Sequence, residues 1–303
     1  MSERLTLALD IGGTKTAAAL VTEDGALLER RRSRTPASLG AGAVMAEALG
    51  MARALMADHA PVGVGIGSAG VIDTDTGTVC SATDALPGWT GTDLRGIFHR
   101  ELGLPVSVAN DVHAHALGEY WRGAARDQEC VLFVAVGTGV GGALLIDGHV
   151  RNGARSAAGH VGHVPVPEAD GVACPCGTNG HVEAVASGPA LERAHRVAGG
   201  PVTRLEDVVE AADRGVPSAR TVLAVGARAL GTALAGAANV LDPDLIVVGG
   251  GVTAAGKHWW PHLRQGVTDG TIPALRGLPV AASQLGADAA LLGAARLVRR
   301  EQG

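Results

Sequence analysis

The hydrophobic pattern of the chain occurs twice. Residues 5–27 read as a strand, a Gly-Thr turn, a second strand and an Asp-Gly turn, and residues 130–150 read the same way. In both segments, runs of β-forming residues flank a glycine loop, which is the pattern of a hairpin. Helical and further strand patterns follow each segment. We therefore predict a duplicated α/β unit, whose first copy ends near residue 120.

The rest of the pattern predicts alternating helices and strands. Long runs with helical spacing or a high alanine content predict helices, and short apolar runs predict buried strands. The predicted helices cover residues 40–58, 111–121, 216–240 and 287–299, and the predicted strands cover residues 62–67, 104–109 and 244–248. This alternation implies mixed α/β sheets with helices on their faces. The basic run Arg30-Arg31-Arg32 is interpreted as a solvated strand end.

Composition and charge narrow the class of protein. With 303 residues the chain is long enough for two domains, which we expect at 1–120 and 121–303. The net charge of −5 argues against a nucleic-acid or anionic-membrane partner. The first residues lead straight into an apolar strand and no apolar run is judged long enough to cross a bilayer, so neither a signal peptide nor a membrane span is expected. Two of the four cysteines lie one residue apart, a spacing that suits a metal better than a disulfide, and we expect a cytoplasmic protein.

The first glycine loop follows the first predicted strand. It contains Asp10, Gly12, Gly13, Thr14 and Lys15. Glycines let backbone N–H groups approach phosphate oxygens closely, and a neighbouring carboxylate can hold Mg²⁺ through water. A plain hairpin turn is the alternative, but such a turn needs fewer glycines. We therefore predict a phosphate-binding loop.

The second glycine loop contains a literal G-x-G-x-x-G at residues 137–142. A dinucleotide-binding fold would require a helix directly after this loop, whereas a strand and a turn follow here. A second phosphate-binding hairpin, with Gly137, Thr138 and Gly139, fits better. Gly250 and Gly251 come at the carboxyl end of a predicted strand, where a nucleotide could lie against the backbone.

The pair Asn110-Asp111 stands where a predicted strand ends and a helix begins. Both residue types are good helix N-caps, which is one interpretation. The other is a sugar anchor at Asn110 and a general base at Asp111, because phosphoryl transfer to an alcohol requires a proton acceptor. His113 and His115 face apart on the same helix, so they are interpreted as helix-wall residues rather than as a metal pair.

A cluster of histidine and cysteine residues lies between residues 159 and 183. His163, Cys174, Cys176 and His181 supply two imidazoles and two thiols, which suits a tetrahedral structural Zn²⁺ site. The alternative is a pair of buried thiols with loop histidines. His160 and Glu183 flank these residues and are candidates to touch a substrate.

Together these motifs resemble the ROK family of sugar kinases and sugar-responsive repressors. The resemblance covers nearly the whole chain and rests on DIGGTKT at 10–16, NDVHAHALGE at 110–119, VGTGVGGALL at 136–145, the 159–183 block and NVLDPDLIVVGGGV at 239–252. It implies a two-lobed actin–hexokinase (ribonuclease H-like) fold, with ATP in a cleft between the lobes. The last helix, at about 287–299, would pack back on the N-terminal lobe.

The resemblance also implies roles for individual residues. Asp111 would be the catalytic base, and Asn110, His163 and Glu183 would hold sugar hydroxyls. Ser68 and Gly70 would line the sugar pocket. His163 would also bind the structural zinc. The expected ligands are thus ATP, Mg²⁺, Zn²⁺ and a sugar, in a homodimer or homotetramer.

Two positions depart from the family pattern. His181 stands where the family has a third cysteine, and histidine can still bind zinc. His160 stands where the family has a glutamate that accepts hydrogen bonds from the sugar. A neutral histidine accepts one bond and donates one, so the pocket should prefer a different group at C2, such as an acetamide carbonyl. The same replacement looks like that of bacterial N-acetylmannosamine kinases, and we favour N-acetylmannosamine over glucose.

Two other classes of function remain as alternatives. A sugar-responsive repressor would carry a helix-turn-helix ahead of the kinase-like part, and the first strand begins too early to leave room for one; the net charge also disfavours DNA. A non-catalytic sugar-binding or regulatory relative is supported only by the change at His160.

Overall fold

The structure is a computed structural model that describes residues 4–83, 85–201 and 204–302. Its contacts divide the chain into two compact units. The N-terminal unit comprises Met1–Asp127, Gly148–Ala158 and Gln284–Gly303, and the C-terminal unit comprises Gln128–Asp147 and Gly159–Ser283. The expected domains were 1–120 and 121–303, with the last helix packed back on the N-terminal lobe. In this division the first segment ends at Asp127, and residues 148–158 also belong to the N-terminal unit.

A five-stranded mixed sheet forms the centre of the N-terminal unit, in the order β3-β2-β1-β4-β7. β1 pairs antiparallel with β2 and parallel with β4, and β4 pairs parallel with β7. The elements of this unit are β1 (Thr6–Ile11), β2 (Lys15–Val21), β3 (Leu27–Arg34), α1 (Ala41–Met56), β4 (Val64–Ser68), β5 (Val71–Asp73), β6 (Thr78–Ser81), α2 (Leu94–Leu102), β7 (Val106–Asn110), α3 (Asp111–Arg122), β10 (His149–Val150) and α9 (Ala289–Gln302). The basic run of residues 30–32 thus lies within an edge strand, β3.

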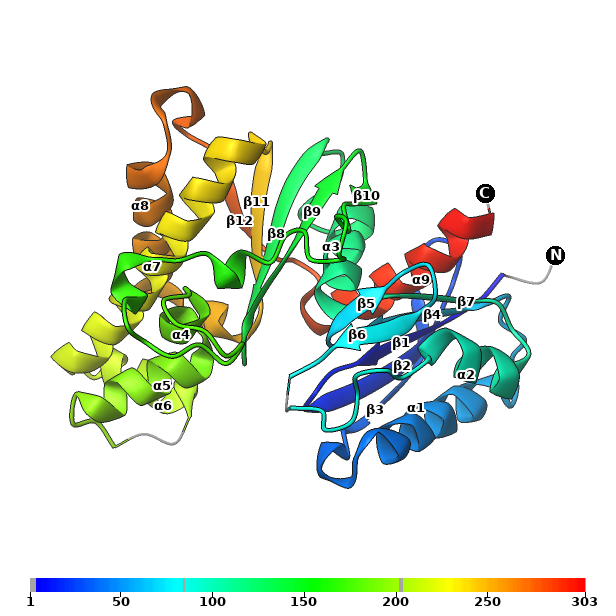
Figure 1. Cartoon of the computed structure of the whole chain (residues 1–303). Coiled ribbons are helices and arrows are strands. Elements are labelled where there is room, and N and C mark those ends of the chain that lie inside the picture. Colours follow the sequence, from blue (N-terminus) through cyan, green and yellow to red (C-terminus); the bar gives the residue numbers. More distant parts are fainter. Residues whose placement is uncertain (1–3, 84, 202–203, 303) are drawn as a thin grey trace. The chain divides into compact units, whose positions relative to one another are not determined.

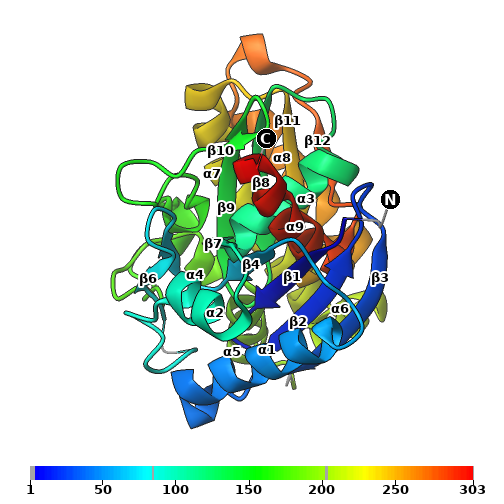
Figure 2. The same ribbon diagram turned by 90° about the vertical axis from the view of Figure 1, so that its right-hand side faces the viewer.

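Helices cover both faces of this sheet (Figure 1). Large side chains of β1, such as Leu7 and Leu9, pack with α1 and α2 on one face. On the other face the sheet presents small residues, such as Ala8 and Ala19, to α9. Figure 2 shows α1 running along the sheet on the first of these faces. The small residues bring α9 very close to the strands, because little side-chain volume separates the backbones.

Helices α3 and α9 pack closely against each other in the N-terminal unit. A Cβ atom placed on Gly118 would clash with the carbonyl oxygen of Ala289, and one placed on Gly293 would clash with that of Ala114. Glycine therefore stands where the two backbones touch. The predicted terminal helix is present as α9, and it packs on α3, β1 and β4.

The C-terminal unit repeats this topology. Its strands follow the order β9-β8-β11-β12, with an antiparallel β8–β9 hairpin and parallel pairs on the other side. The N-terminal order β2-β1-β4-β7 has the same pattern, which confirms the predicted duplication. The elements are β8 (Cys130–Val136), β9 (Val140–Ile146), α4 (Glu183–Ala186), α5 (Gly188–Val197), α6 (Leu205–Asp213), α7 (Pro217–Leu241), β11 (Leu245–Gly249), α8 (Trp260–Gly270) and β12 (Val280–Ala282), with 3-10 turns at Val161–His163, Pro167–Ala169, Gly251–His258 and Pro273–Leu275.

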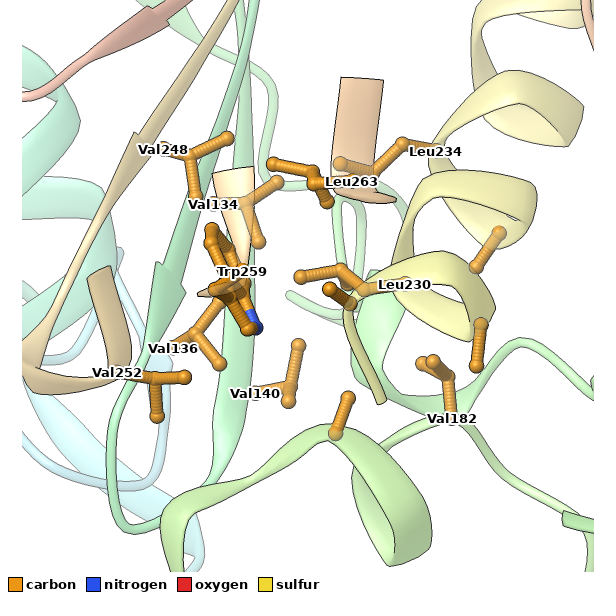
Figure 3. Packing of buried hydrophobic residues seen from close by; sticks show 14 of the residues in the cluster. Val134, Val136, Val140, Val182, Leu230, Leu234, Val248, Val252, Trp259 and Leu263 are labelled. Atoms are coloured by element: carbon orange, nitrogen blue, oxygen red, sulfur yellow. The ribbon is translucent and has the colours of Figure 1, made fainter. Parts of the chain in front are cut away.

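The core of the C-terminal unit forms between β8, β11 and helices α7 and α8 (Figure 3). Trp259 is fully buried there, facing Val134 and Val136 from β8 and Leu230 from α7. Its ring meets Trp260 edge to face, with centroids 5.3 Å apart. The two tryptophans therefore serve packing, as aromatic pairs commonly do.

Helix α7 corrects one expectation from the sequence. It has 25 residues and a window with a mean hydropathy of 1.4, so by length and composition it could cross a membrane. However, 56% of that window is buried inside the C-terminal unit, as in the core helix of a water-soluble domain. A single apolar helix of this kind is therefore only weak evidence for a membrane span.

Candidate active site

The first glycine loop lies at the carboxyl edge of the N-terminal sheet. Asp10 is near the end of β1, and the Gly12 N–H donates to the Lys15 carbonyl at 3.0 Å to close the turn into β2. Ile11 is in register with Ser68 of β4, and Ser68 with Asn110 of β7. Three parallel strands therefore bring the loop and the residues that follow β4 and β7 to one edge, where open α/β sheets bind ligands.

Asn110 is the N-cap of α3. Its Oδ1 accepts from the backbone N–H groups of Val112 at 2.9 Å and His113 at 3.2 Å. Its Nδ2 donates to the Gly70 carbonyl at 2.8 Å and to Asp111 Oδ1 at 2.9 Å. The structure thus shows the capping role, which stabilises the helix start. The sugar-anchor role stays a prediction.

Asp111 opens α3 with one carboxylate oxygen fixed. Oδ1 accepts from the Val112 N–H at 2.9 Å as well as from Asn110, whereas Oδ2 has no hydrogen bond to another described residue. Burial raises the pKa of Asp111, and the nearby His115 lowers it. A half-buried carboxylate with one free oxygen beside a glycine loop is a suitable proton acceptor.

His115 belongs to this charge cluster, which its interpretation as a helix-wall residue missed. Its Nδ1 lies 3.2 Å from the Asp111 carbonyl oxygen. Burial raises the pKa of Asp10 to about 6, against the opposing effects of His115 and Arg32. The spacing of four residues from Asp111 was the available signal, because such residues are neighbours on a helix.

Arg32 lies two strands away from Asp10 in the N-terminal sheet. Asp10 is in register with Ala17 of β2, and Ala17 with Arg32 of β3, so the three side chains share one face of the sheet. Ala17 is too small to separate the two charged groups. Sequence pattern alone could not find this pair, because it depends on the register of β3.

Ser68 and Gly70 hold the backbone that surrounds this edge. Ser68 is fully buried, and its hydroxyl accepts from Trp89 Nε1 at 3.1 Å. Gly70 has a φ of 100°, and its carbonyl accepts from Asn110. Gly70 therefore supports the Asn110-Asp111 turn, and the Ser68 hydroxyl is tied to Trp89. The contact of either residue with a sugar stays a prediction.

The second glycine loop has the same place in the C-terminal sheet. The Gly137 N–H donates to the Gly139 carbonyl at 2.8 Å, and the loop leads into strand β9. The absence of a helix after this loop confirms that it is not a dinucleotide fingerprint. Because β8 and β11 are parallel, Gly250 and Gly251 lie at the same edge. Gly250 has a φ of 92° and leaves no room for a side chain against the Val136 carbonyl.

Glu183 connects this loop to the histidine–cysteine cluster. Its Oε2 accepts from the Val140 N–H at 2.8 Å, directly after Thr138 and Gly139. Its Oε1 lies 3.9 Å from Cys174 Sγ. The carboxylate is therefore held between the phosphate-loop candidate and the metal-site candidate.

The four predicted zinc ligands come together in the structure. One donor atom from each of His163, Cys174, Cys176 and His181 lies within 4.8 Å of all the others. Cys174 Sγ is 3.9 Å from His163 Nδ1, and Cys176 Sγ is 3.2 Å from His181 Nδ1. Both distances are close to those between ligands of a tetrahedral Zn²⁺ with bonds of about 2.0–2.3 Å. Two sulfurs and two imidazole nitrogens therefore fit zinc.

The thiols of this cluster differ in their surroundings. Burial raises the pKa of Cys174 to about 11, whereas hydrogen bonds from Thr178 lower the pKa of the exposed Cys176 to about 7. All four cysteines of the chain are free of disulfides. Zinc binds the thiolate form, so it would displace the Cys174 proton on binding.

His160 lies against the ligand His163. The two rings are stacked with centroids 6.2 Å apart and planes at 23°. His160 Nδ1 is buried, and within the described part of the chain it has no hydrogen-bond partner. A buried ring nitrogen without a partner is suited to a polar group of a ligand.

Comparison with known proteins decides the family. The model of the ROK family matches residues 6–301. The chain belongs to the ROK family. A glucokinase of Halalkalibacterium halodurans is 32% identical over 100% of this chain and 97% of its own length. An N-acetylmannosamine kinase of Yersinia pseudotuberculosis is 34% identical over 97% of this chain and 98% of its own length.

Solved ROK structures resemble the chain in fold as well. A ROK family glucokinase from Streptomyces griseus, crystallised with glucose and AMPPNP, has a TM-score of 0.85 and 33% identity, covering 98% of this chain and 99% of that one. The predicted family and the predicted α/β fold class are therefore confirmed for this ROK protein.

Proposed function

We propose that this ROK protein is an ATP-dependent kinase that phosphorylates the 6-hydroxyl of a hexose or an N-acylhexosamine. Family membership and the sugar kinases among its relatives support this proposal. The observation that carries it is Asp111, a half-buried carboxylate with a free oxygen at the sheet edge that also holds the first glycine loop. Acceptor activation and phosphate binding are the two tasks of such an enzyme.

In this mechanism the protein positions the sugar and the phosphates, and one of its carboxylates accepts a proton. Asp111 Oδ2 accepts the proton of the sugar 6-hydroxyl as the new O–P bond forms and the bond to ADP breaks. Asn110 and the Val112 N–H hold the other oxygen, which fixes the carboxylate plane. Backbone N–H groups of the glycine loops bind phosphate oxygens. Mg²⁺, held through water near Asp10, would neutralise charge on the transferred phosphate.

A structural zinc would orient the sugar-binding residues. His163, Cys174, Cys176 and His181 would hold the ion, because their donor atoms already converge. Zinc bound by these four residues would fix the ring of His163, against which the ring of His160 is stacked. It would also fix Glu183, which lies beside Cys174. His163 and Glu183 can then hold sugar hydroxyls in a defined geometry.

We favour N-acetylmannosamine as the substrate, with glucose as the alternative. His160 supports the first, because its unpaired Nδ1 can donate to an acetamide carbonyl when it carries the proton. The second rests on the glucokinases among the relatives. The two sugars differ at C2, both in the group, which is a hydroxyl in glucose and an acetamide in N-acetylmannosamine, and in the configuration of that carbon.

The substitution His160→Glu tests this choice. A carboxylate only accepts hydrogen bonds, so it should favour sugar hydroxyls over an acetamide carbonyl. We expect kcat/KM for N-acetylmannosamine to fall by about tenfold or more and that for glucose to rise, the size expected for one mismatched polar contact. Wild-type protein that prefers glucose, or a variant with unchanged preference, would contradict the assignment of His160.

A further inference from the structure

A buried threonine pair lies behind the first glycine loop. Thr35, directly after β3, is 5% exposed, and Thr16 of β2 is fully buried. Thr35 Oγ1 donates to the Gly12 carbonyl at 2.7 Å and lies 2.9 Å from Thr16 Oγ1. Because the Thr35 proton is used by Gly12, Thr16 is the donor in the contact between the two hydroxyls. The Thr35 N–H also donates to the Thr14 carbonyl at 3.0 Å.

These bonds fix the direction of the loop peptides. The carbonyls of Gly12 and Thr14 both point to Thr35. In a planar trans peptide the C=O and the following N–H point in opposite directions. Holding the Gly12 carbonyl therefore turns the Gly13 N–H away from Thr35. The N–H groups of Gly13 and Thr14 make no hydrogen bond to another residue that the structure describes.

We propose that Thr35 is a positioning residue for phosphate binding, which holds the Gly12 carbonyl so that the Gly13 N–H points at a phosphate of the nucleotide. The proposal rests on the proposed kinase function. Thr35 itself touches neither phosphate nor sugar. Its two donors act only through the loop backbone, and the buried Thr16 hydroxyl keeps the Thr35 hydroxyl in the required rotamer.

Two substitutions at Thr35 and a control test this role. Thr35→Val keeps the shape but removes the hydroxyl, and Thr35→Ser retains it. Thr22→Val is the matched control, because Thr22 is also buried and its hydroxyl bonds the Ala26 N–H at 2.8 Å in the turn between β2 and β3. The readouts are the dissociation constant of Mg²⁺-AMPPNP, that of the sugar, and the melting temperature.

We expect Thr35→Val to weaken Mg²⁺-AMPPNP by about tenfold, the effect of losing one or two buried hydrogen bonds. Thr35→Ser and Thr22→Val should stay within about threefold of wild type, and sugar affinity should be unchanged in all three, because only the loop is altered. Wild-type nucleotide affinity in Thr35→Val would overturn the proposal. So would an equal loss in Thr22→Val, or a parallel loss of sugar affinity.

A second measurement needs no variant. In wild-type protein, the amide resonance of Gly13 should shift on addition of Mg²⁺-AMPPNP, and an unchanged resonance at saturation would overturn the proposal even if Thr35→Val does not fold. Wild-type protein that binds the nucleotide but phosphorylates no sugar would refute the kinase function alone. The role of Thr35 would then still be decided by the nucleotide affinities.

Discussion

At the scale of single residues, two carboxyl groups, one histidine and one arginine form a cluster at the edge of the N-terminal sheet. Burial makes ionisation of Asp10 and Asp111 costly, and the Asp111 carboxylate further raises the pKa of Asp10. His115 lowers the pKa of both carboxyl groups, and Arg32 lowers that of Asp10. Such a cluster suits a base that must hold a proton briefly and release it again.

The pH dependence of turnover should report this cluster. Asp111 must be ionised to accept a proton, and its pKa is raised, so activity is present above that pKa and is lost as the pH falls through it. We expect the acidic limb of kcat/KM at a pH above the ordinary carboxyl pKa of about 4, because the pKa of Asp111 is raised. His115→Ala should move the limb to higher pH, because His115 lowers both pKa values. A limb near pH 4 in wild type would contradict this.

At the scale of elements, close packing of α3 on α9 joins the terminal segment to the helix that begins with Asp111. Gly118 and Gly293 make the approach possible, since either position would clash with a carbonyl of the other helix if it carried a Cβ. The helix that begins with Asp111 is therefore held from behind by the last helix of the chain. Its position depends on residues far from the site in sequence.

Gly293→Ala should therefore destabilise the protein by about 1–3 kcal/mol, as expected for overpacking. Gly50→Ala is the matched control, because Gly50 lies on an exposed face of α1 with nothing within 4 Å of the added Cβ. There alanine should stabilise by about 0.5–1 kcal/mol. Urea unfolding measures both, and equal stability of the two variants would show that the helices do not depend on this contact.

The loop of residues 159–183 should depend on metal. We expect about one zinc ion per chain, as four converging donors bind it tightly. Cys174→Ser should lose most of this zinc, whereas Cys80→Ser should keep it, since Cys80 is an exposed cysteine outside the cluster. Elemental analysis after dialysis measures the content, and wild-type zinc in Cys174→Ser would show that the ligands are wrong.

At the scale of the whole molecule, the features that follow from a local sequence pattern could be predicted from the sequence. The two hairpins, the long helices and the four clustered ligands follow from periodicity and spacing. The electrostatic effect of Arg32 on Asp10, the buried Ser68–Trp89 bond and the Thr35 contact depend on strand register and loop closure. No local pattern encodes these, because they join residues brought together only by the fold.

The sharpest test of the central claim is phosphate transfer from ATP to glucose, mannose, N-acetylglucosamine and N-acetylmannosamine, with wild type and Asp111→Asn compared and the products identified by phosphorus NMR. We predict a sugar 6-phosphate from wild type. Asp111→Asn should lose at least about a hundredfold in kcat, the contribution of a general base, while it binds the sugar as before. No phosphorylated sugar from wild type, or equal turnover in Asp111→Asn, would contradict the proposal that Asp111 activates a sugar hydroxyl.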